Sequence, residues 1–295
     1  MTSAVRSAMS VVLSHVSVRS LREARKRGDT EAEASLDLGL TTTSVRLDDG
    51  GVELTGGARL PWAAVERIAR TETQCFEVAD GEIEPIRAFS EELGRVYTLM
   101  PTERAPTMLV SGMPMHRIRG TDPVADTERK VAALAPLSGH VLDTATGLGY
   151  TAIAAAEKGA DVLTIELDPL VLEVASRNPW SAALFGHRRI EQRVGDAVDV
   201  VAGLPAASFD RVLHDPPVIA LGGDLYGASF YRELWRVLRP GGRLFHYVGN
   251  PDSPSGARTT RGVLRRLGDV GFKGIRPRRD AFGVVAVKGG PVGWG

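Results

Sequence analysis

Four acidic residues from position 143 onward each stand at or just after the end of a short apolar run: Asp143, Glu166, Asp196 and Asp215. Ligands of open parallel sheets bind at the carboxyl ends of the strands, near the point where the strand order reverses. Carboxylates at that edge can accept hydrogen bonds from hydroxyl and amino groups. The chemistry to look for is therefore recognition of a nucleotide-like molecule and of an amine.

A glycine-bearing turn follows Asp143 and leads into a helix. Gly147 and Gly149 precede residues 150–158, an alanine-rich segment with high helix propensity. A strand, a glycine turn and a helix in this order leave free backbone N–H groups over the strand end, where a nucleotide-like ligand can lie. Two glycines at this spacing occur in many loops, so the residues at the other strand ends are needed to identify the ligand.

The next two strand ends fit an adenosine. Glu166 lies 23 residues past Asp143, and an acid about 20 residues past a glycine turn is placed to accept the ribose hydroxyls. Asp196 can accept from an adenine amino group while the backbone N–H of Ala197 donates to a ring nitrogen. Capping of the next helix is the alternative role for both Glu166 and Asp196. After Glu166, the following acid Asp168 is better placed to cap the helix, whereas Asp196 can cap a helix and bind a ligand at the same time.

Asp215 ends the fourth run and is followed by two prolines. Proline cannot donate to a sheet ladder, so Pro216 and Pro217 turn the chain out of the sheet and present carbonyls beside Asp215. An ionisable acid next to carbonyl oxygens is suited to holding an amine, which makes Asp215 and Pro216 the candidate catalytic residues. An acid that merely ends a strand before a turn is an equal alternative for this motif taken alone.

The fifth strand end, FHYVGNP, contains further polar side chains. Side chains alternate along a strand, so at most one of His246 and Tyr247 faces a ligand. A histidine in such a strand is more often a satisfied core residue than a catalyst. The candidate substrate residues are Tyr226, His246, Asn250 and His116.

Alternating strands and helices from Gly139 onward must position these residues. Seven apolar runs predict strands at 140–143, 161–166, 189–194, 209–215, 243–248, 272–276 and 283–288. Helical crossovers join most of them, which predicts a seven-stranded, mainly parallel Rossmann-like α/β sheet with helices on both faces. The short link at 277–282 permits an antiparallel last pair.

Residues 1–110 predict a small α+β domain, with helices at 17–27 and 61–69 and a hairpin turn at 48–51. We interpret it as an accessory or substrate-shaping domain. A helix-turn-helix reader of nucleic acid is the alternative, although no base-reading pattern is visible. Residues 111–138 predict a linker or lid, containing His116, and a lead-in helix at 126–134; a linker with solvated charges is an equal alternative. The sheet domain spans 139–295.

The composition of the chain argues against several classes of protein and kinds of site. The 295 residues include 36 basic and 36 acidic side chains, so whole-chain charge does not indicate nucleic-acid binding. The single Cys75 rules out an intramolecular disulfide and a multi-cysteine zinc site, and the six histidines give no ligand set, so we expect no metal. No apolar run is long enough to span a membrane, and residues 1–13 lack the core of a signal peptide, which predicts a cytoplasmic protein.

A set of motifs in a fixed order carries a family resemblance: the glycine turn, the acid at 166, Gly-Asp-Ala at 195–197, Asp-Pro-Pro at 215–217 and Arg-Pro-Gly-Gly at 239–242. Together they resemble the class I S-adenosylmethionine-dependent methyltransferases over about 139–289, which implies S-adenosyl-L-methionine as cofactor. TGLGYTAI, the NPW at 178–180, HDPP and the upstream MHR further resemble a family of predicted, largely archaeal methyltransferases.

The resemblance implies a role for each strand end. Asp143 and the backbone over 145–149 (Ala145, Gly147, Gly149) hold the methionine end of the cofactor. Glu166 holds the ribose, and Asp196 with Ala197 holds the adenine. Asp215 and the Pro216 carbonyl orient an acceptor nitrogen, and Asp215 can receive its proton.

Two residues depart from the family pattern. Ala145 stands where the first motif has glycine. Val218 stands where amino-methyltransferases carry an aromatic residue that stacks on the target base. The remaining candidates for stacking are Tyr226, Phe230 and Tyr231.

We therefore expect an S-adenosylmethionine-dependent methyltransferase that acts on a nitrogen of a small amine or of an RNA base. One alternative is an aminopropyltransferase using decarboxylated S-adenosylmethionine, with Asp215 and Asp224 binding a polyamine, but the Gly-Gly-Gly-Asp-Gly turn of that family is absent. The other is a non-catalytic nucleic-acid-binding protein, because residues 258–279 carry eight basic residues against one acid, Asp269. A solvated helix face is the simpler interpretation of that segment. The sequence leaves the methyl acceptor and the oligomeric state open.

Overall fold

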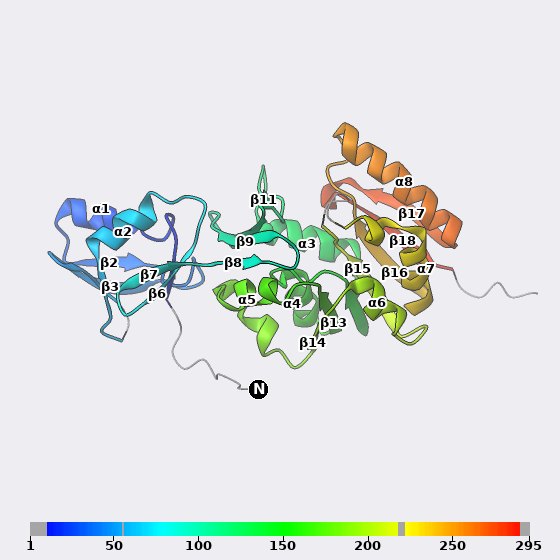
Figure 1. Cartoon of the computed structure of the whole chain (residues 1–295), viewed down its shortest axis with the longest axis horizontal. Coiled ribbons are helices and arrows are strands. Elements are labelled where there is room, and N and C mark those ends of the chain that lie inside the picture. The colour runs from blue at the N-terminus through cyan, green and yellow to red at the C-terminus, as the bar shows by residue number, and fades with distance from the viewer. Residues whose placement is uncertain (1–10, 55, 218–221, 290–295) are drawn as a thin grey trace, which may run out of the picture. The chain divides into compact units, whose positions relative to one another are not determined.

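The computed structural model describes residues 11–54, 56–217 and 222–289. The chain divides into two compact units (Figure 1). Unit 1 comprises Met1–Pro123 with Glu173–Ala182, and unit 2 comprises Val124–Leu172 with Ala183–Gly295. The division at 123/124 falls inside the segment expected to link two domains, and the domain limits at 110 and 139 stay predictions. The prediction that residues 1–13 do not form a signal peptide concerns a segment that lies mostly outside the described residues.

In the described residues before Pro123, unit 1 consists of short antiparallel strands and two helices. Its three sheets have the orders β2-β3-β4-β5, β1-β6-β7 and β11-β10-β9-β8. The helices are α1 (Arg19–Arg27) and α2 (Trp62–Ala69). The strands are β1 (Val11–Leu13), β2 (Glu31–Ala34), β3 (Thr43–Asp48), β4 (Gly51–Glu53), β5 (Arg59–Pro61), β6 (Phe76–Ala79), β7 (Glu82–Pro85), β8 (Arg87–Ser90), β9 (Arg95–Met100), β10 (Thr107–Val110) and β11 (Met113–Pro114).

The local signals in unit 1 have the expected consequences. Helix α1 ends at Gly28, whose φ of 79° is a left-handed conformation that glycine adopts at little cost. The turn at 48–51 joins β3 to β4 as an antiparallel hairpin. Leu21, Trp62, Ile68 and Phe76 bring both helices and the strands into one buried core. The small α+β unit predicted for the first part of the chain is confirmed.

The NPW stretch, which lies between two strands of the other unit, packs within unit 1. The Trp180 indole N–H donates to the Leu38 carbonyl at 3.0 Å. Just before it, Arg177 pairs with Glu77 at 2.7 Å, and both side chains are largely buried. These contacts explain why residues 173–182 belong to unit 1, which nothing in the sequence pattern indicates.

Unit 2 contains the predicted seven-stranded sheet, with the order β14-β13-β12-β15-β16-β18-β17. Its strands are β12 (His140–Asp143), β13 (Asp161–Glu166), β14 (Ile190–Val194), β15 (Phe209–His214), β16 (Leu238–Tyr247), β17 (Phe272–Arg278) and β18 (Gly283–Lys288). All neighbours among the first five strands are parallel, whereas β18 runs antiparallel to both β16 and β17. The strand order reverses between β12 and β15, so a ligand site is expected at their carboxyl ends.

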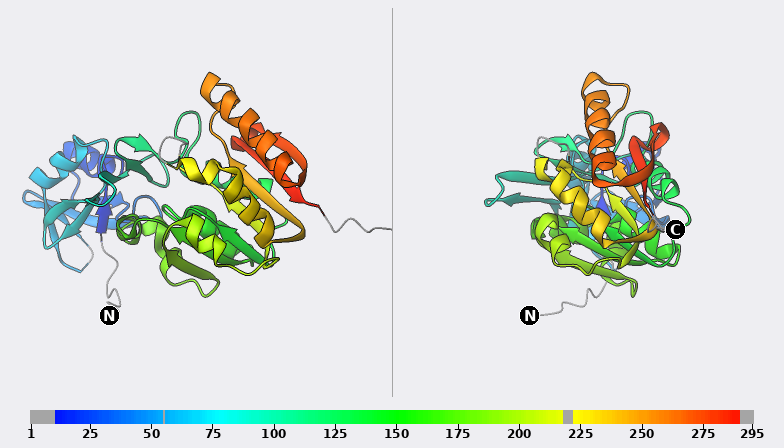
Figure 2. Two further views of the ribbon diagram at one scale, coloured as in Figure 1. Left: turned by 45° about the vertical axis from the view of Figure 1, so that its right-hand side comes forward. Right: turned by 90° about the vertical axis from the view of Figure 1, so that its right-hand side faces the viewer.

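Helices connect and cover these strands (Figure 2). They are α3 (Pro123–Ala133), α4 (Tyr150–Glu157), α5 (Pro169–Ser176), α6 (Ala197–Ala202), α7 (Ala228–Val237) and α8 (Pro254–Val270), with short 3-10 turns η1 (Pro179–Phe185), η2 (Gly223–Tyr226) and η3 (Arg279–Ala281). The crossover through α4 moves from β12 to β13, and that through α6 returns from β14 to β15. Right-handed crossovers in opposite directions place their helices on opposite faces of the sheet.

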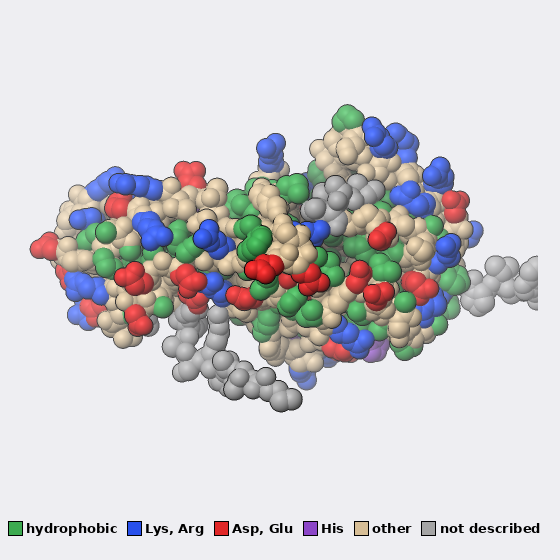
Figure 3. Space-filling model, viewed as in Figure 1, with side chains coloured by type: hydrophobic (Ala, Val, Ile, Leu, Met, Phe, Trp, Pro, Cys, Tyr) green, Lys and Arg blue, Asp and Glu red, His purple; other side chains and the backbone are tan. Residues whose placement is uncertain are grey.

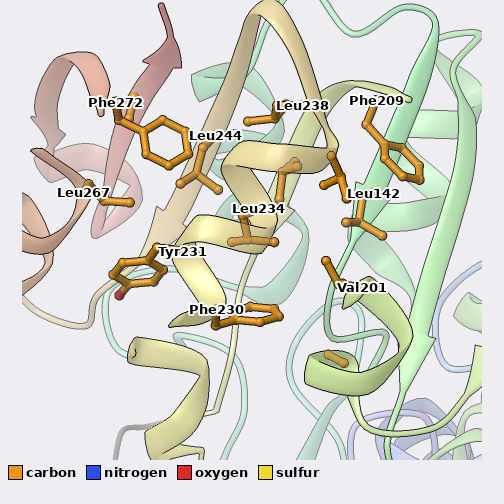
Figure 4. Close-up of a cluster of buried hydrophobic side chains, with 14 of the residues drawn as sticks. Leu142, Val201, Phe209, Phe230, Tyr231, Leu234, Leu238, Leu244, Leu267 and Phe272 are labelled. Carbon is orange, nitrogen blue, oxygen red and sulfur yellow. The ribbon is translucent and has the colours of Figure 1, made fainter. Parts of the chain in front are cut away.

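One hydrophobic core of unit 2 lies between the sheet and helices α6, α7 and α8 (Figure 4). Leu142 and Leu244 from the sheet meet Val201, Leu234 and Leu267 from the three helices, and all five side chains are fully buried. Burying a side chain of this size contributes about 1.5–3 kcal/mol relative to leaving it exposed. This packing fixes the strand ends that carry the polar residues.

Strand β16 begins five residues earlier than predicted. Phe209 pairs with Leu238 before a register shift, and regular pairing resumes at Arg243. Gly241 has a φ of 77°, and a Cβ on Gly242 would lie 2.8 Å from the Arg239 carbonyl oxygen. The Pro-Gly-Gly sequence therefore bends a continuous strand, where the sequence suggested a break before it.

Candidate active site

The turn after β12 is organised by the buried carboxylate of Asp143. Its Oδ2 accepts hydrogen bonds from the hydroxyls of Thr151 at 2.9 Å and Thr164 at 3.3 Å, and Oδ1 accepts from the Ala145 N–H at 3.4 Å. Burial raises the pKa of Asp143 to about 7, against the lowering effect of the Thr151 hydrogen bond. The nearby charge of Asp215 raises it further. The structure thus brings the first and fourth strand-end acids together.

The two glycines and Ala145 fit their positions for different reasons. Gly147 and Gly149 have φ values of 54° and 77°, which favour glycine. Ala145 lies outside the left-handed region, so an alanine there costs no backbone strain. Within residues 143–149 Ala145 is also the least buried residue. The departure from the family's glycine is therefore tolerated at the point where the turn is open.

Glu166 ties the second strand end to this turn. Its Oε2 accepts the Gly147 N–H at 2.9 Å, and its Oε1 accepts the Asp168 N–H at 3.2 Å. The next strand joins the same edge, because the Gly195 N–H donates to the Glu166 backbone carbonyl at 2.8 Å. Burial raises the pKa of Glu166, and the backbone donor Gly147 opposes that rise. Each carboxylate oxygen has a second lone pair for a ligand hydroxyl.

Asp196 and Ala197 stand at the start of α6. The Asp196 carboxylate accepts the Val198 N–H at 2.8 Å, so the capping role considered for it is present. Asp196 is exposed, whereas Ala197 is buried. Their contact with an adenine stays a prediction.

Asp215 belongs to a buried charged cluster that the sequence reasoning missed. Lys130 Nζ lies 2.6 Å from Asp215 Oδ2 and 2.9 Å from Asp126 Oδ2. The side chains of Lys130 and Asp126 are 2% and 0% exposed, whereas that of Asp215 is 19% exposed. Lys130 also lies over the Tyr247 ring, 4.7 Å from its centroid. We call Asp126, Lys130 and Asp215 the charged triad.

The charged triad has one cation for two carboxylates. Burial raises the pKa of Asp215, and the Lys130 ammonium opposes that rise. Both carboxylates hold the pKa of Lys130 above its ordinary value despite burial. Lys130 occupies Asp215 Oδ2, so a molecule at the sheet edge meets the partly exposed remainder of this carboxylate. The arrangement suits a methyl acceptor whose N–H groups donate hydrogen bonds to the carboxylate.

The neutral side chain of His214 stabilises, through two hydrogen bonds, the strand end that carries Asp215. His214 Nε2 donates to the Leu225 carbonyl at 2.9 Å, since that oxygen can only accept, and Nδ1 then accepts from the Thr144 hydroxyl at 2.6 Å. Burial lowers the pKa of His214 to about 4, which keeps the ring neutral. Thr144 and His214 thus hold the ends of β12 and β15 in a fixed register.

His246 is fully buried and its Nε2 lies 2.8 Å from the Tyr231 hydroxyl, which fits the core interpretation of this histidine. Alternation is confirmed, because Tyr247 points the other way, toward Lys130. Tyr226 is also buried, and its hydroxyl donates to the Pro217 carbonyl at 3.2 Å. Phe230 is buried as well. The expectation that Tyr226, Phe230 or Tyr231 offers a ring to stack on a base is therefore wrong, because all three are packed in the core; Val218 lies outside the described residues.

The other predicted residues are placed as follows. Pro216 is buried beside Asp215, and Pro217 is exposed. Asn250 is exposed after β16, where its side-chain oxygen accepts the Asp252 N–H at 3.0 Å. His116 lies in unit 1, with Nδ1 3.0 Å from the Thr107 hydroxyl, so its relation to the sheet edge stays a prediction.

The sheet edge offers the donor and acceptor set that S-adenosylmethionine needs. The turn at 145–149 lies between two carboxylates, Asp143 and Glu166, and the N-terminus of α4 begins directly behind it. Carboxylates can accept from the cofactor's ammonium and ribose hydroxyls. The residues present therefore fit this cofactor.

The sheet order, the turn and the strand-end acids define a class I S-adenosylmethionine-dependent methyltransferase, and residues 142–246 match the family model described as a methyltransferase domain. An uncharacterized protein from Methanocaldococcus jannaschii is 45% identical over 226 residues, which cover 76% of this chain and 77% of that protein. The chain belongs to the same family as this archaeal protein.

Two more distant likenesses concern enzymes of polyamine synthesis. Polyamine aminopropyltransferase 2 from Streptomyces coelicolor is 32% identical over 152 residues, which cover 44% of this chain but only 27% of that protein. The crystal structure of spermidine synthase from Thermotoga maritima superposes with a TM-score of 0.57 at 18% identity, covering 69% of this chain and 72% of that one. The second likeness shows the shared fold alone. In the described part of the chain, no helix is both long and apolar enough to cross a membrane.

Proposed function

We propose that the protein methylates an amino nitrogen, in an alkylamine or in a base of RNA, that is held at Asp215. The observation that supports this proposal is the charged triad, which presents a partly exposed carboxylate beside the cofactor turn with its other oxygen fixed by Lys130. An amino group can donate one hydrogen bond to Asp215 and a second to the carbonyl of Pro216.

Methyl transfer from a sulfonium requires no covalent bond between the substrate and the protein. S-adenosylmethionine supplies a methyl group already activated on a sulfonium. The residues of the sheet edge place the nitrogen in line with that methyl and exclude water, and placement of this kind can lower a barrier by about 7–11 kcal/mol. The nitrogen forms a bond to the methyl carbon as the carbon–sulfur bond breaks, and the surplus proton on nitrogen passes to Asp215 or to water.

A screen of methyl acceptors tests the proposal. The protein is incubated with methyl-labelled S-adenosylmethionine and separated RNA, protein and small-metabolite fractions. We expect label in the RNA or the small-metabolite fraction, on nitrogen. Label that appears only in the protein fraction, or only on oxygen or carbon, would contradict the proposal.

A second candidate is transfer of an aminopropyl group to an amine, favoured by the 32% identity to the Streptomyces aminopropyltransferase. It needs the same nitrogen at Asp215 but decarboxylated S-adenosylmethionine as donor. Asp224, the other polyamine-binding candidate, lies in η2. Supplying the two donors in parallel separates the candidates, because turnover only with the decarboxylated donor supports the aminopropyltransferase.

A further inference from the structure

Unit 2 carries a group of basic side chains that the methyl-transfer site does not use. Three of them on one helix are exposed and, among the residues that the structure describes, have no hydrogen-bond or ion-pair partner: Arg258, Arg261 and Arg265. We call these three residues the basic ridge. In the view of Figure 1, Figure 3 shows Lys and Arg side chains gathered over the part of unit 2 that contains α8 and β17.

Helix α8 presents all three along one line. Arg258, Arg261 and Arg265 have the i, i+3, i+7 spacing that places side chains on one face of a helix. Val263 and Leu267, on the opposite face, are fully buried against the sheet. The three guanidinium groups therefore point directly outward, over a length of about 10 Å at 1.5 Å per residue.

Two further exposed basic residues, Lys273 and Arg276, belong to β17 but not to this line. They pair with Val287 and Val285 of β18, whereas Val284 and Ala286 pack in the core under α8, so Lys273 and Arg276 lie on the face of the sheet turned away from α8. Asp269 is the nearest acid in sequence on the outer face of α8. Further along, Arg278 and Arg279 are already paired, with Asp280 and Asp252 respectively.

The basic ridge leads toward the methyl-transfer edge. Helix α8 begins just after Asn250, beyond the carboxyl end of β16, so Arg258 is the ridge arginine nearest that edge. Arg265, seven residues further along the helix, lies toward the other end. The ridge thus forms a track whose near end is on the side of Asp143 and Asp215.

We propose that the basic ridge binds the phosphodiester backbone of a nucleic-acid strand. Guanidinium groups without partners bind phosphates without breaking an existing ion pair, and their planar fork fits phosphate oxygens. The chain has zero net charge, so this local excess is not the consequence of a basic protein. RNA and DNA share the backbone that the ridge recognises. The binding goes beyond the proposed function, because it does not depend on which nitrogen is methylated.

The test is fluorescence anisotropy with a labelled single-stranded RNA over a salt series, using the full chain. The ridge variant is Arg258→Gln with Arg261→Gln and Arg265→Gln. The matched control removes the same charge from exposed positions of α1, of α2 and of the residue that follows α2, as Lys26→Gln with Arg67→Gln and Arg70→Gln. Thermal unfolding of both variants checks that they are folded.

We expect the wild-type protein and the control to bind RNA with salt-dependent affinity. The ridge variant should lose about tenfold or more, with the slope of log affinity against log salt shallower by about 2, since each phosphate contact to a single strand contributes about 0.7. Equal affinity for DNA of the same sequence would support recognition of the backbone that RNA and DNA share. A higher affinity for RNA would identify RNA as the natural ligand. No binding at low salt, equal losses in both triple variants, or equally tight binding of polyglutamate would overturn the proposal.

Discussion

At the scale of single residues, Lys130 is the centre of the site. It is fully buried, yet it lies within ion-pair distance of two carboxylates from different parts of the chain. Buried charges are stable only when they are paired and hydrogen-bonded. Lys130 therefore acts as the counter-charge that lets an ionisable acid stand at the end of β15, where an acceptor can reach it.

Replacing Lys130 with methionine should destabilise the protein by about 3–5 kcal/mol, because the buried carboxylate of Asp126 and the partly exposed one of Asp215 then lose the ammonium between them. The double variant Asp126→Asn with Lys130→Met should recover part of this loss, since it removes one charge of each sign. Urea unfolding measures both effects. Equal stability of wild type and Lys130→Met would show that the charged triad is not formed in solution.

Asp143 should make stability depend on pH. Its pKa is about 7 when folded and 3.8 as the ordinary value, so the native state holds the proton over that interval while the unfolded state has lost it. The free energy of unfolding should consequently fall as pH rises from about 4 to about 7. Asp143→Asn should lack this contribution, and unfolding of both proteins across that range measures it. Parallel pH curves for the two would contradict the burial argument.

At the scale of elements, the glycine turn depends on close packing against η1. A Cβ on Gly149 would lie 2.6 Å from a Leu184 methyl carbon, and its φ is 77°. Gly159, which follows α4, has a φ of 92° but no atom within 4 Å of an added Cβ. The two glycines thus separate backbone strain from steric overlap.

Gly159→Ala should therefore cost about 1–2 kcal/mol from left-handed strain alone. Gly149→Ala should cost more, by about 1–3 kcal/mol for the overlap with Leu184, and should also weaken cofactor binding because the turn shifts. Denaturant unfolding and calorimetric titration with S-adenosylhomocysteine check the two parts. A smaller loss of stability for Gly149→Ala than for Gly159→Ala would contradict this account.

Much of this element scale follows from sequence, because its signals are local. Alternating apolar runs and helical crossovers predict the seven strands, and the ends of β12, β13 and β18 fall where expected. The acids at or just after the ends of β12, β13, β14 and β15 follow from the same reasoning. The triad does not, since Lys130 and Asp215 are 85 residues apart and meet only through the fold. A faint signal exists in Asp126 and Lys130, an i, i+4 pair at the apolar face of α3.

The aromatic residues after the Asp-Pro-Pro motif are misplaced by the family resemblance. Because Val218 stands where that family carries a stacking ring, the resemblance leaves Tyr226, Phe230 and Tyr231 as the candidates for stacking. The amphipathic spacing of α7 places Phe230 and Tyr231 on its buried face, together with Leu234 and Val237. The periodicity of α7 therefore predicts burial of Phe230 and Tyr231, which the family pattern does not.

At the scale of the whole molecule, the cofactor should be a ligand of the native state that other nucleotides do not replace. A ligand that binds only the folded protein stabilises it by about 2.7 kcal/mol at a hundred times its dissociation constant. We therefore expect S-adenosylmethionine and S-adenosylhomocysteine to raise the thermal unfolding midpoint, and NAD or ATP at the same concentration to leave it unchanged. A rise with NAD alone would assign the site to another nucleotide.

The central claim is that Asp215 acts on the methyl acceptor and not on the cofactor. The most direct measurement compares wild type and Asp215→Asn for the initial rate of methyl transfer to the fraction labelled in the screen, with the affinity for S-adenosylhomocysteine measured by calorimetry. Our account predicts a rate lower by about 10²–10⁴-fold, the usual contribution of a positioned general base, with cofactor affinity changed little. Wild-type turnover in Asp215→Asn would contradict it, as would a loss of cofactor affinity large enough to explain the loss of rate.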